Sequence, residues 1–338
     1  MVNRQVVLAA HPQGVPVASD FRLVEAAVPV AGPGQMVVRN LYLSLEAAIR
    51  GWLDGTANYF EPIVLGGAIR GPSIGRVESS RLAGFEPGDL IFGLHHWEDY
   101  SLSDANTVLL RKLTPNPLLP LSWYAGALGG SGQTAYVGLH RIGAIKPGDT
   151  VLVSAAAGAT GSIACQIAAI EGCRVVGIVG ADEKAEVVRE TLGADTVINY
   201  RKEPDLAGAL VQACPEGVNV YFDNVGGTTL DAALMAMAQG GRIVGCGMIS
   251  DYNNAASPTP LYNLWQVVER QLSLQGFLLY SYLDEVPAAS AALEAWLSAG
   301  RLTVLENVTE GLPAAGSAYS AMMAGATIGK NIVCVDQT

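Results

Sequence analysis

The sequence of 338 residues has no cysteine before Cys165, and its five cysteines form no C-x-x-C pair. The four histidines, at positions 11, 95, 96 and 140, show no metal-ligand spacing. We therefore expect no metal site. Each cysteine lies in or beside a predicted helix or strand, so we expect buried thiols in a reducing compartment, and we predict a cytoplasmic protein.

Long hydrophobic runs and clusters of positive charge are also missing. No apolar stretch approaches the roughly 20 residues that span a bilayer, and His11 and Pro12 interrupt the apolar run near the N-terminus. The net charge is −11, which argues against nucleic acid and anionic membranes as partners. Half of the residues are hydrophobic and 15% are charged, so the chain can form large cores, and its length allows two domains.

Residues 151–162 predict a strand, a tight turn and a helix. The apolar residues 151–153 are typical of a buried strand. Gly158 would let the backbone approach a bulky anion, and Gly161 would let the helix lie close to the strand. Because helix N-termini bind phosphate, the pattern predicts a dinucleotide site. Ala156 replaces the first glycine of the usual fingerprint, so an ordinary glycine-containing turn stays an alternative.

The next residues alternate between strand and helix. Asp182 is the predicted N-cap of one helix and Gly193 is its predicted end. This alternation predicts a parallel, doubly wound sheet that binds its ligand at the carboxyl ends of the strands. The predicted strands are 174–179, 196–199, 218–223, 242–246 and 271–277, and the further predicted helices are 204–214 and 228–238.

The first part of the chain is different, because short β-rich runs are separated there by glycine and proline. We predict strands at 5–9, 36–43, 74–78, 90–94 and 108–111, and a last strand at 331–335 that rejoins this region. The sequence thus predicts an α/β protein with a β-barrel-like domain of residues 1–118 and 306–338. Residues 119–305 form the predicted Rossmann domain.

Several segments, taken together and in order, resemble the medium-chain dehydrogenase/reductase superfamily. The likeness is greatest to its zinc-independent branch of prostaglandin reductases, plant phenylpropenal double-bond reductases and curcumin reductase. It implies a GroES-like catalytic domain, a Rossmann NADP-binding domain and a homodimer. The segments are NLYLS (40–44) with Arg50, WEDYS (97–101), GQTAYVGL (132–139), AAAGATGS (155–162), DEK (182–184), NY (199–200), DNVGG (223–227) and GMISDYN (247–253).

The expected cofactor is NADPH. An NAD-preferring site has an acidic residue at the end of the second strand, but here that end is Gly180, with Lys184 a helical turn further. In the resembled family, the residues that match Lys184 and Tyr200 contact the 2′-phosphate. A solvated lysine and a packed tyrosine are the alternatives. The resemblance implies further cofactor contacts by Gly132, Thr134, Ala157, Gly158, Ala159, Thr160, Gly161, Asn224, Gly247, Met248, Ile249, Ser250, Tyr252, Phe277, Thr327 and Asn331.

The predicted reaction is NADPH-dependent reduction of the C=C bond of an α,β-unsaturated ketone or aldehyde. Hydride transfer to the β-carbon leaves negative charge on the carbonyl oxygen as an enolate, and that oxygen needs a hydrogen-bond donor. By the resemblance, Tyr252 is the candidate donor. A buried tyrosine that only satisfies a loop carbonyl is the alternative, and the α-carbon can take its proton from a ribose hydroxyl or from water.

The resemblance also indicates the walls of the substrate pocket, although core packing is an equal alternative for the aromatic candidates. Ala48 stands where relatives have an aromatic residue, and Gly67 lies in a segment that often contains a tyrosine, so we expect a wider pocket. Quinone reduction, allylic alcohol oxidation and a catalytically silent NADPH sensor are the alternative functions. The apolar segment 272–279 suits a sheet edge in a dimer. The candidate pocket residues are Ala48, Tyr59, Gly67, Trp97, Tyr262 and Tyr280.

Overall fold

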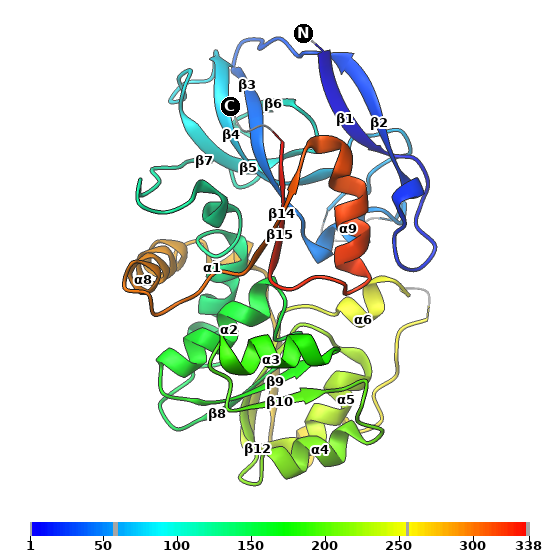
Figure 1. The fold of residues 1–338 in the computed structure, drawn as a ribbon, viewed down its shortest axis with the longest axis vertical. Coiled ribbons are helices and arrows are strands. Elements are labelled where there is room, and N and C mark those ends of the chain that lie inside the picture. Colours follow the sequence, from blue (N-terminus) through cyan, green and yellow to red (C-terminus); the bar gives the residue numbers. More distant parts are fainter. Residues whose placement is uncertain (1, 57–59, 255–256, 336–338) are drawn as a thin grey trace. The chain divides into compact units, whose positions relative to one another are not determined.

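The computed structural model describes residues 2–56, 60–254 and 257–335. The chain forms two compact units (Figure 1). The first unit lies within Met1–Ala125, Glu306–Thr327 and Asn331–Thr338, and the second within Gly126–Leu305 and Ile328–Lys330. In the ranges that the structure describes, no helix is long and apolar enough to cross a membrane.

The second unit is built on a six-stranded sheet whose neighbouring strands are all parallel. The strand order is β10-β9-β8-β11-β12-β13, so the winding reverses between β8 and β11. Ligands bind at the carboxyl ends of the strands beside such a switch point. The predicted doubly wound sheet is confirmed, and its strands are β8 (Thr150–Val153), β9 (Arg174–Val179), β10 (Thr196–Asn199), β11 (Val218–Asp223), β12 (Met237–Gly245) and β13 (Ser273–Gly276).

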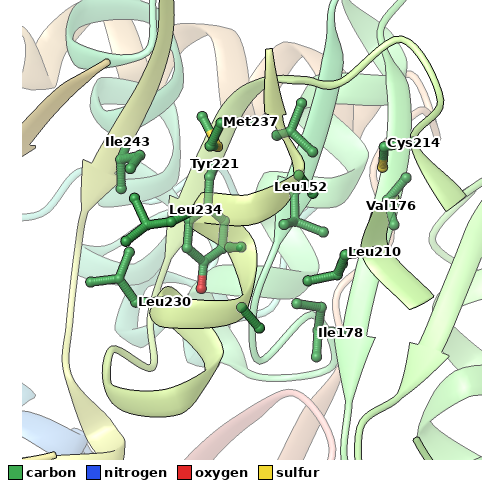
Figure 2. Close-up of a cluster of buried hydrophobic side chains, with 14 of the residues drawn as sticks. Leu152, Val176, Ile178, Leu210, Cys214, Tyr221, Leu230, Leu234, Met237 and Ile243 are labelled. Atoms are coloured by element: carbon green, nitrogen blue, oxygen red, sulfur yellow. The ribbon is translucent and has the colours of Figure 1, made fainter. Parts of the chain in front are cut away.

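Helices cover this sheet. α2 (Ala159–Ile170) packs on β8 and β9, and α3 (Asp182–Glu190) packs on β9 and β10. Figure 2 shows the core completed by α4 (Leu206–Ala213) and α5 (Gly227–Ala236), where Leu210, Leu230 and Leu234 meet apolar strand residues. Each buried leucine contributes about 1.5–3 kcal/mol to folding. Further helices are α1 (Gly130–Val137), η4 (Gly138–Ile142), α6 (Ile249–Tyr252), α7 (Gln266–Glu269), η5 (Leu279–Tyr282) and α8 (Val286–Ser298).

The start of α3 differs from the prediction. Ala181 is the N-cap, so the prediction that Asp182 caps the helix is wrong. The Asp182 carboxylate instead accepts hydrogen bonds from the Asn199 side chain, at 2.8 Å, and from Lys202. Gly193 has φ +74° and ends this segment as predicted, because a residue with a Cβ rarely adopts that conformation.

The first unit is mainly antiparallel. Its larger sheet has the order β14-β15-β3-β4-β5-β7, with β6 also paired to β3, and β1 pairs with β2. The strands are β1 (Val2–Leu8), β2 (Phe21–Ala27), β3 (Gln35–Ser44), β4 (Arg70–Ser80), β5 (Leu90–His96), β6 (Tyr100–Asp104), β7 (Arg111–Lys112), β14 (Glu306–Glu310) and β15 (Lys330–Cys334). Short helices are η1 (Ala18–Asp20), η2 (Ala47–Trp52), η3 (Leu121–Ala125), η6 (Leu312–Ala314) and α9 (Ala315–Met323).

Hydrophobic patterning missed three strands here and misplaced one. β6 was missed because it turns Ser101 and Ser103 inward, where they form hydrogen bonds instead of apolar contacts. β2 and β14 were missed because they are mostly exposed or half-buried. The predicted strand at 108–111 is wrong except at Arg111, since Leu109 has φ +60° and interrupts the extended backbone.

Candidate active site

The turn after β8 is shaped by glycines. A Cβ atom on Gly161 would lie 2.3 Å from the backbone oxygen of Ala155, so only glycine fits at this position. At Gly158, the N-cap of α2, a Cβ would lie 3.1 Å from the same oxygen. The predicted close approach of helix and strand is therefore present in the structure.

The N-terminus of α2 is suited to an anion. Its N-cap has no side chain that could bond the first N–H groups, which lack partners within the helix itself. Gly329 pairs with Gly158, and its N–H donates to the Ala157 oxygen at 2.7 Å, which fixes the turn from outside. Ala157 is buried, and Ala159 and Thr160 are half-buried at the start of the helix. This cradle suits a pyrophosphate.

The carboxyl end of β9 carries an aromatic ring in place of a carboxylate. A Cβ on Gly180 would lie 2.9 Å from Cε1 of Tyr200 and 3.1 Å from its hydroxyl, so the ring lies directly on the glycine. Lys184 is half-buried near this corner, and burial, with the nearby Arg201, lowers the pKa of its ammonium group. The corner thus carries a positive charge near a flat ring.

Arg201 was missed by the sequence reasoning. Its guanidinium lies 5.9 Å from the centroid of the Tyr200 ring. Arg201 is exposed and directly follows the pair of residues 199–200 that matched the family. A second basic residue next to this pair was the sequence signal that could have identified it. Lys184 and Arg201 together offer two cations to one anionic group.

The turns after β11 and β12 are held together by backbone hydrogen bonds. The carbonyl of Asp223 accepts from the N–H groups of Cys246, at 2.8 Å, and Gly247, at 3.0 Å. The carbonyl of Val225 accepts from both N and Oγ of Ser250, at 3.1 and 2.6 Å. The Ser250 hydroxyl is therefore used within the protein, and its predicted cofactor contact stays a prediction.

The carboxylate of Asp223 is the centre of this arrangement. Its Oδ1 accepts hydrogen bonds from Ser154 Oγ at 3.0 Å, Tyr221 Oη at 2.6 Å, and the backbone N–H groups of Val225 and Gly226. Asn224 is fixed in turn, because its Nδ2 donates to the Ser154 carbonyl at 2.7 Å. The ends of β8 and β11, on either side of the switch point, are thus joined.

Tyr252 ends the short helix α6 above these turns. A Cβ on Gly247 would lie 3.3 Å from the Tyr252 hydroxyl, which places the hydroxyl over the glycine backbone. Burial raises the pKa of Tyr252, and Cys246 and Asp223 raise it further, so the hydroxyl remains protonated and can donate. Met248 is exposed and packs near Gly226, and Ile249 is half-buried.

Three other predicted cofactor residues lie around α1. A Cβ on Gly132 would lie 1.8 Å from the Ala127 oxygen, so packing alone requires glycine there. Thr134 lies inside the helix and not at its start, so the alternative that it is a helix cap is wrong. The Phe277 ring packs near Gly138, where a Cβ would lie 3.0 Å from Cζ.

The predicted pocket residues of the first unit lie on η2, on the approach to β4 and after β5. Ala48 and Gly67 are half-buried, and Arg50 fixes η2 by donating to the carbonyls of Pro12 and Gly14, both at 3.2 Å. Trp97 is fully buried, with ring centroids of Phe21 and Tyr319 at 6.0 and 5.6 Å, so core packing accounts for its position. Tyr59 lies outside the described residues.

The remaining predicted residues are dispersed. In the second unit, Tyr262 is 82% exposed, whereas Tyr280 is half-buried in η5. In the first unit, Asn331 Nδ2 donates to Thr327 Oγ1 at 3.0 Å, so these two predicted cofactor residues contact each other. Across the part of the chain that the structure describes, no group of three His, Cys, Asp or Glu side chains could hold a metal ion.

Comparison with known proteins adds to this geometry. Residues 4–110 match the family "N-terminal domain of oxidoreductase", and residues 159–295 match "Zinc-binding dehydrogenase". YfmJ of Bacillus subtilis is 39% identical, over 98% of both chains. The NADP(+)-dependent 2-alkenal reductase of Nicotiana tabacum is 36% identical, over 99% of this chain and 98% of its own.

One solved structure is similar to this chain in both sequence and fold. CurA from Vibrio vulnificus, crystallised in complex with NADPH, is 36% identical, with a TM-score of 0.91 over 99% of this chain and 100% of its own. A Rossmann unit with a glycine turn, joined in one chain to an antiparallel-rich unit, defines the class of protein. The chain belongs to the medium-chain dehydrogenase/reductase superfamily, in the branch of the alkenal, curcumin and prostaglandin reductases.

Proposed function

We propose that this protein is an NADP-dependent oxidoreductase that uses NADPH to reduce the conjugated C=C bond of α,β-unsaturated ketones or aldehydes. Relatives that align along almost the whole chain include a 2-alkenal reductase and a curcumin reductase, both named for NADP dependence. The observation that carries the proposal is the end of β9, where Gly180, Tyr200 and Lys184 replace the acidic residue of an NAD site.

The glycine turn and the basic corner are the proposed holders of the cofactor. The first N–H groups of α2, from Ala159 onward, would bond the pyrophosphate. Lys184 would bind the 2′-phosphate beside the Tyr200 ring, with Arg201 adding a second cation. Asn224 is held by Ser154 at the switch point and would contact a ribose hydroxyl.

Bound NADPH supplies a hydride to the β-carbon of the substrate. The residues of this chain then have to stabilise the negative charge on the carbonyl oxygen. Tyr252 is the proposed donor, because its hydroxyl, whose pKa burial raises further above neutrality, carries a proton and lies against the Gly247 turn. The proposed site is independent of zinc, since no cysteine precedes Cys165 and the described residues provide no three-ligand cluster.

The decisive experiment measures NADPH oxidation by the purified protein with 2-alkenals, cyclic enones, aryl enones and quinones. We expect turnover of the enals and enones, with the saturated carbonyl compound as product, and none with saturated analogues. Turnover of quinones alone would indicate a quinone reductase. NADPH binding without turnover of any compound would indicate a sensor.

Replacing Tyr252 with phenylalanine tests the proposed donor. Loss of one donor to a developing oxyanion lowers kcat by about a hundred- to a thousandfold, whereas the Kd for NADPH should change little. Tyr124→Phe is the matched control, because it removes a buried hydroxyl that accepts from Asn116 N at 2.8 Å in the first unit. An unchanged kcat in Tyr252→Phe would remove this residue from the mechanism.

We further propose a cytoplasmic homodimer that forms along β13. All four residues of this end strand are exposed, including Leu274 (48%), and Trp265 (67%) and Val268 (64%), shortly before it in the chain, are also exposed apolar side chains. Pairing of two such edges would extend the sheet across a twofold axis. Light scattering should give a dimer for the wild type and a monomer for Leu274→Lys, and a monomeric wild type at micromolar concentration would contradict this.

A further inference from the structure

Arg70, the first residue of β4, has unusual surroundings. Its guanidinium carbon lies 5.4 Å from the ring centroid of Trp52 and 5.4 Å from that of Phe60. The two rings are themselves packed edge to face, with centroids 5.0 Å apart. One guanidinium nitrogen, Nη2, donates to the carbonyl of Glu61 at 2.7 Å. The aromatic rings thus hold the guanidinium group in one orientation.

The guanidinium group of Arg70 forms no direct ion pair within the described part of the chain: burial lowers its pKa, and the Glu61 carboxylate, which is not in direct contact with it, partly offsets this. Among the described residues, no acidic side chain lies within 4.0 Å of it, and its buried Nε has no hydrogen-bond partner. Some other arginines are in ion pairs: Arg4 binds Asp99 at 2.8 Å, and Arg242 binds Asp149 at 2.9 Å. The protein carries 31 acidic and 20 basic residues, so an arginine without a direct ion pair is not explained by a shortage of carboxylates.

Arg70 also lies among the elements that carry the predicted substrate residues of the first unit. Trp52 ends η2, the helix that contains Ala48. Gly67 precedes Arg70 by three residues on the approach to β4. A guanidinium group that is planar, positively charged and only half-buried can bind a carboxylate through two N–H donors.

We propose that Arg70 is a specificity-determining residue that binds a carboxylate on the substrate, away from the reacting C=C bond. This inference rests on the proposed function and names its substrate class, the unsaturated ketones or aldehydes that also carry a carboxylate. A purely structural role for Arg70, holding Trp52 and Phe60 against β4 through cation–π contacts, would affect all substrates equally. A role in binding carboxylates affects only the acids.

The test uses pairs of enones with the same skeleton, one a free carboxylic acid and the other its methyl ester, with NADPH and the full chain. The wild type should have a kcat/KM for the acid about ten- to a hundredfold above that for the ester, the range for a hydrogen bond to a charged group. Arg70→Gln should remove this preference through KM and leave the ester within about twofold. Arg70→Lys should retain part of it.

Arg111→Gln is the matched control, because the Arg111 guanidinium is also stacked on a ring, 4.1 Å from the Phe92 centroid, in the same unit. It should keep the preference for the acid. Thermal melting and the Kd for NADPH check that each variant is folded. Equal loss for acid and ester in Arg70→Gln, or no preference in the wild type, would overturn the proposal.

A binding measurement separates this inference from the proposed function. Calorimetric titration needs no turnover, so the binding of saturated keto acids and of their esters can be measured without any reaction. Tighter binding of the acid, lost in Arg70→Gln, supports the carboxylate site even if no enone is reduced. Equal binding of acid and ester refutes the site even if enones are good substrates.

Discussion

Lowering the pH should destabilise the first unit through one buried histidine. His95 on β5 is 2% exposed, with Nδ1 2.9 Å from Ser73 Oγ and Nε2 3.3 Å from Ser103 Oγ. Ser73 donates its hydrogen to Asn40 Oδ1 at 2.8 Å, so it can only accept from His95, and Nδ1 must carry the proton. Ser103 Oγ also lies 2.9 Å from Thr107 Oγ1; because either hydroxyl of this pair can donate to the other, Thr107 can donate to Ser103 and leave the Ser103 hydrogen for Nε2.

Burial lowers the pKa of His95 from 6.5 to about 4, with the neighbouring His96 acting in the same direction and Glu98 opposing it. The folded pKa is below the unfolded one, so the unfolded chain binds the extra proton first. The stability is therefore complete above about pH 6.5 and falls as the pH drops toward 4. The whole effect is about 3 kcal/mol, and about 2 kcal/mol of it is already lost at pH 5.

Urea unfolding of the full chain at pH 8 and pH 5 measures this loss. His95→Gln and His95→Asn should be less stable at pH 8, because hydrogen bonds are lost, but should lack about 2 kcal/mol of the wild-type pH dependence. With only four histidines in the chain, NMR of ¹⁵N-labelled histidine can also follow His95 directly. Titration near pH 6.5, an Nε2–H tautomer, or equal pH dependence in the wild type and both variants would refute the reasoning.

Three further predictions concern the cofactor. Lys184→Ala should weaken NADPH binding by about 1–3 kcal/mol and leave NADH unchanged in calorimetric titrations; equal losses would exclude a phosphate contact. Gly161→Ala should weaken both cofactors in the same assay, because its Cβ would lie 2.3 Å from the Ala155 oxygen, and unaltered binding would contradict the steric argument. Arg201→Gln should reduce NADPH affinity less than Lys184→Ala, since Arg201 is exposed and solvent screens its charge. A larger loss in Arg201→Gln would make Arg201, and not Lys184, the main cation for the phosphate.

The parallel sheet was predictable because each strand is a short apolar run with a turn behind it. The predicted strands 174–179, 196–199 and 218–223 coincide with β9, β10 and β11, and the family motifs placed the glycine turns. The antiparallel unit was less predictable because part of its interior is polar. Ser101 and Ser103 point inward toward Asn40 and His95, so the alternation of apolar and polar residues is lost in β6.

Single residues of the candidate site were predicted less well than the motifs that contain them. The sequence offered Trp97 as a pocket wall, but it is fully buried against Phe21. It gave no sign of Arg70, whose position depends on where the rings of Trp52 and Phe60 lie. A motif fixes the backbone of a turn, whereas the direction of a side chain depends on contacts between distant segments.

These differences suggest a division of roles within the protein. Several glycine positions in the second unit are constrained by close neighbours. A Cβ on Gly132 or Gly161 would lie within 2.3 Å of a carbonyl oxygen, and the Tyr200 ring packs directly against Gly180. At such positions a larger side chain cannot fit unless the neighbouring backbone moves, which at Gly161 disturbs the turn proposed to hold the cofactor. The predicted pocket of the first unit is instead shaped by side chains, such as that of Ala48, which evolution can exchange while the turns stay intact. This division of roles agrees with the different substrates for which the relatives are named, including 2-alkenals, curcumin and pulegone.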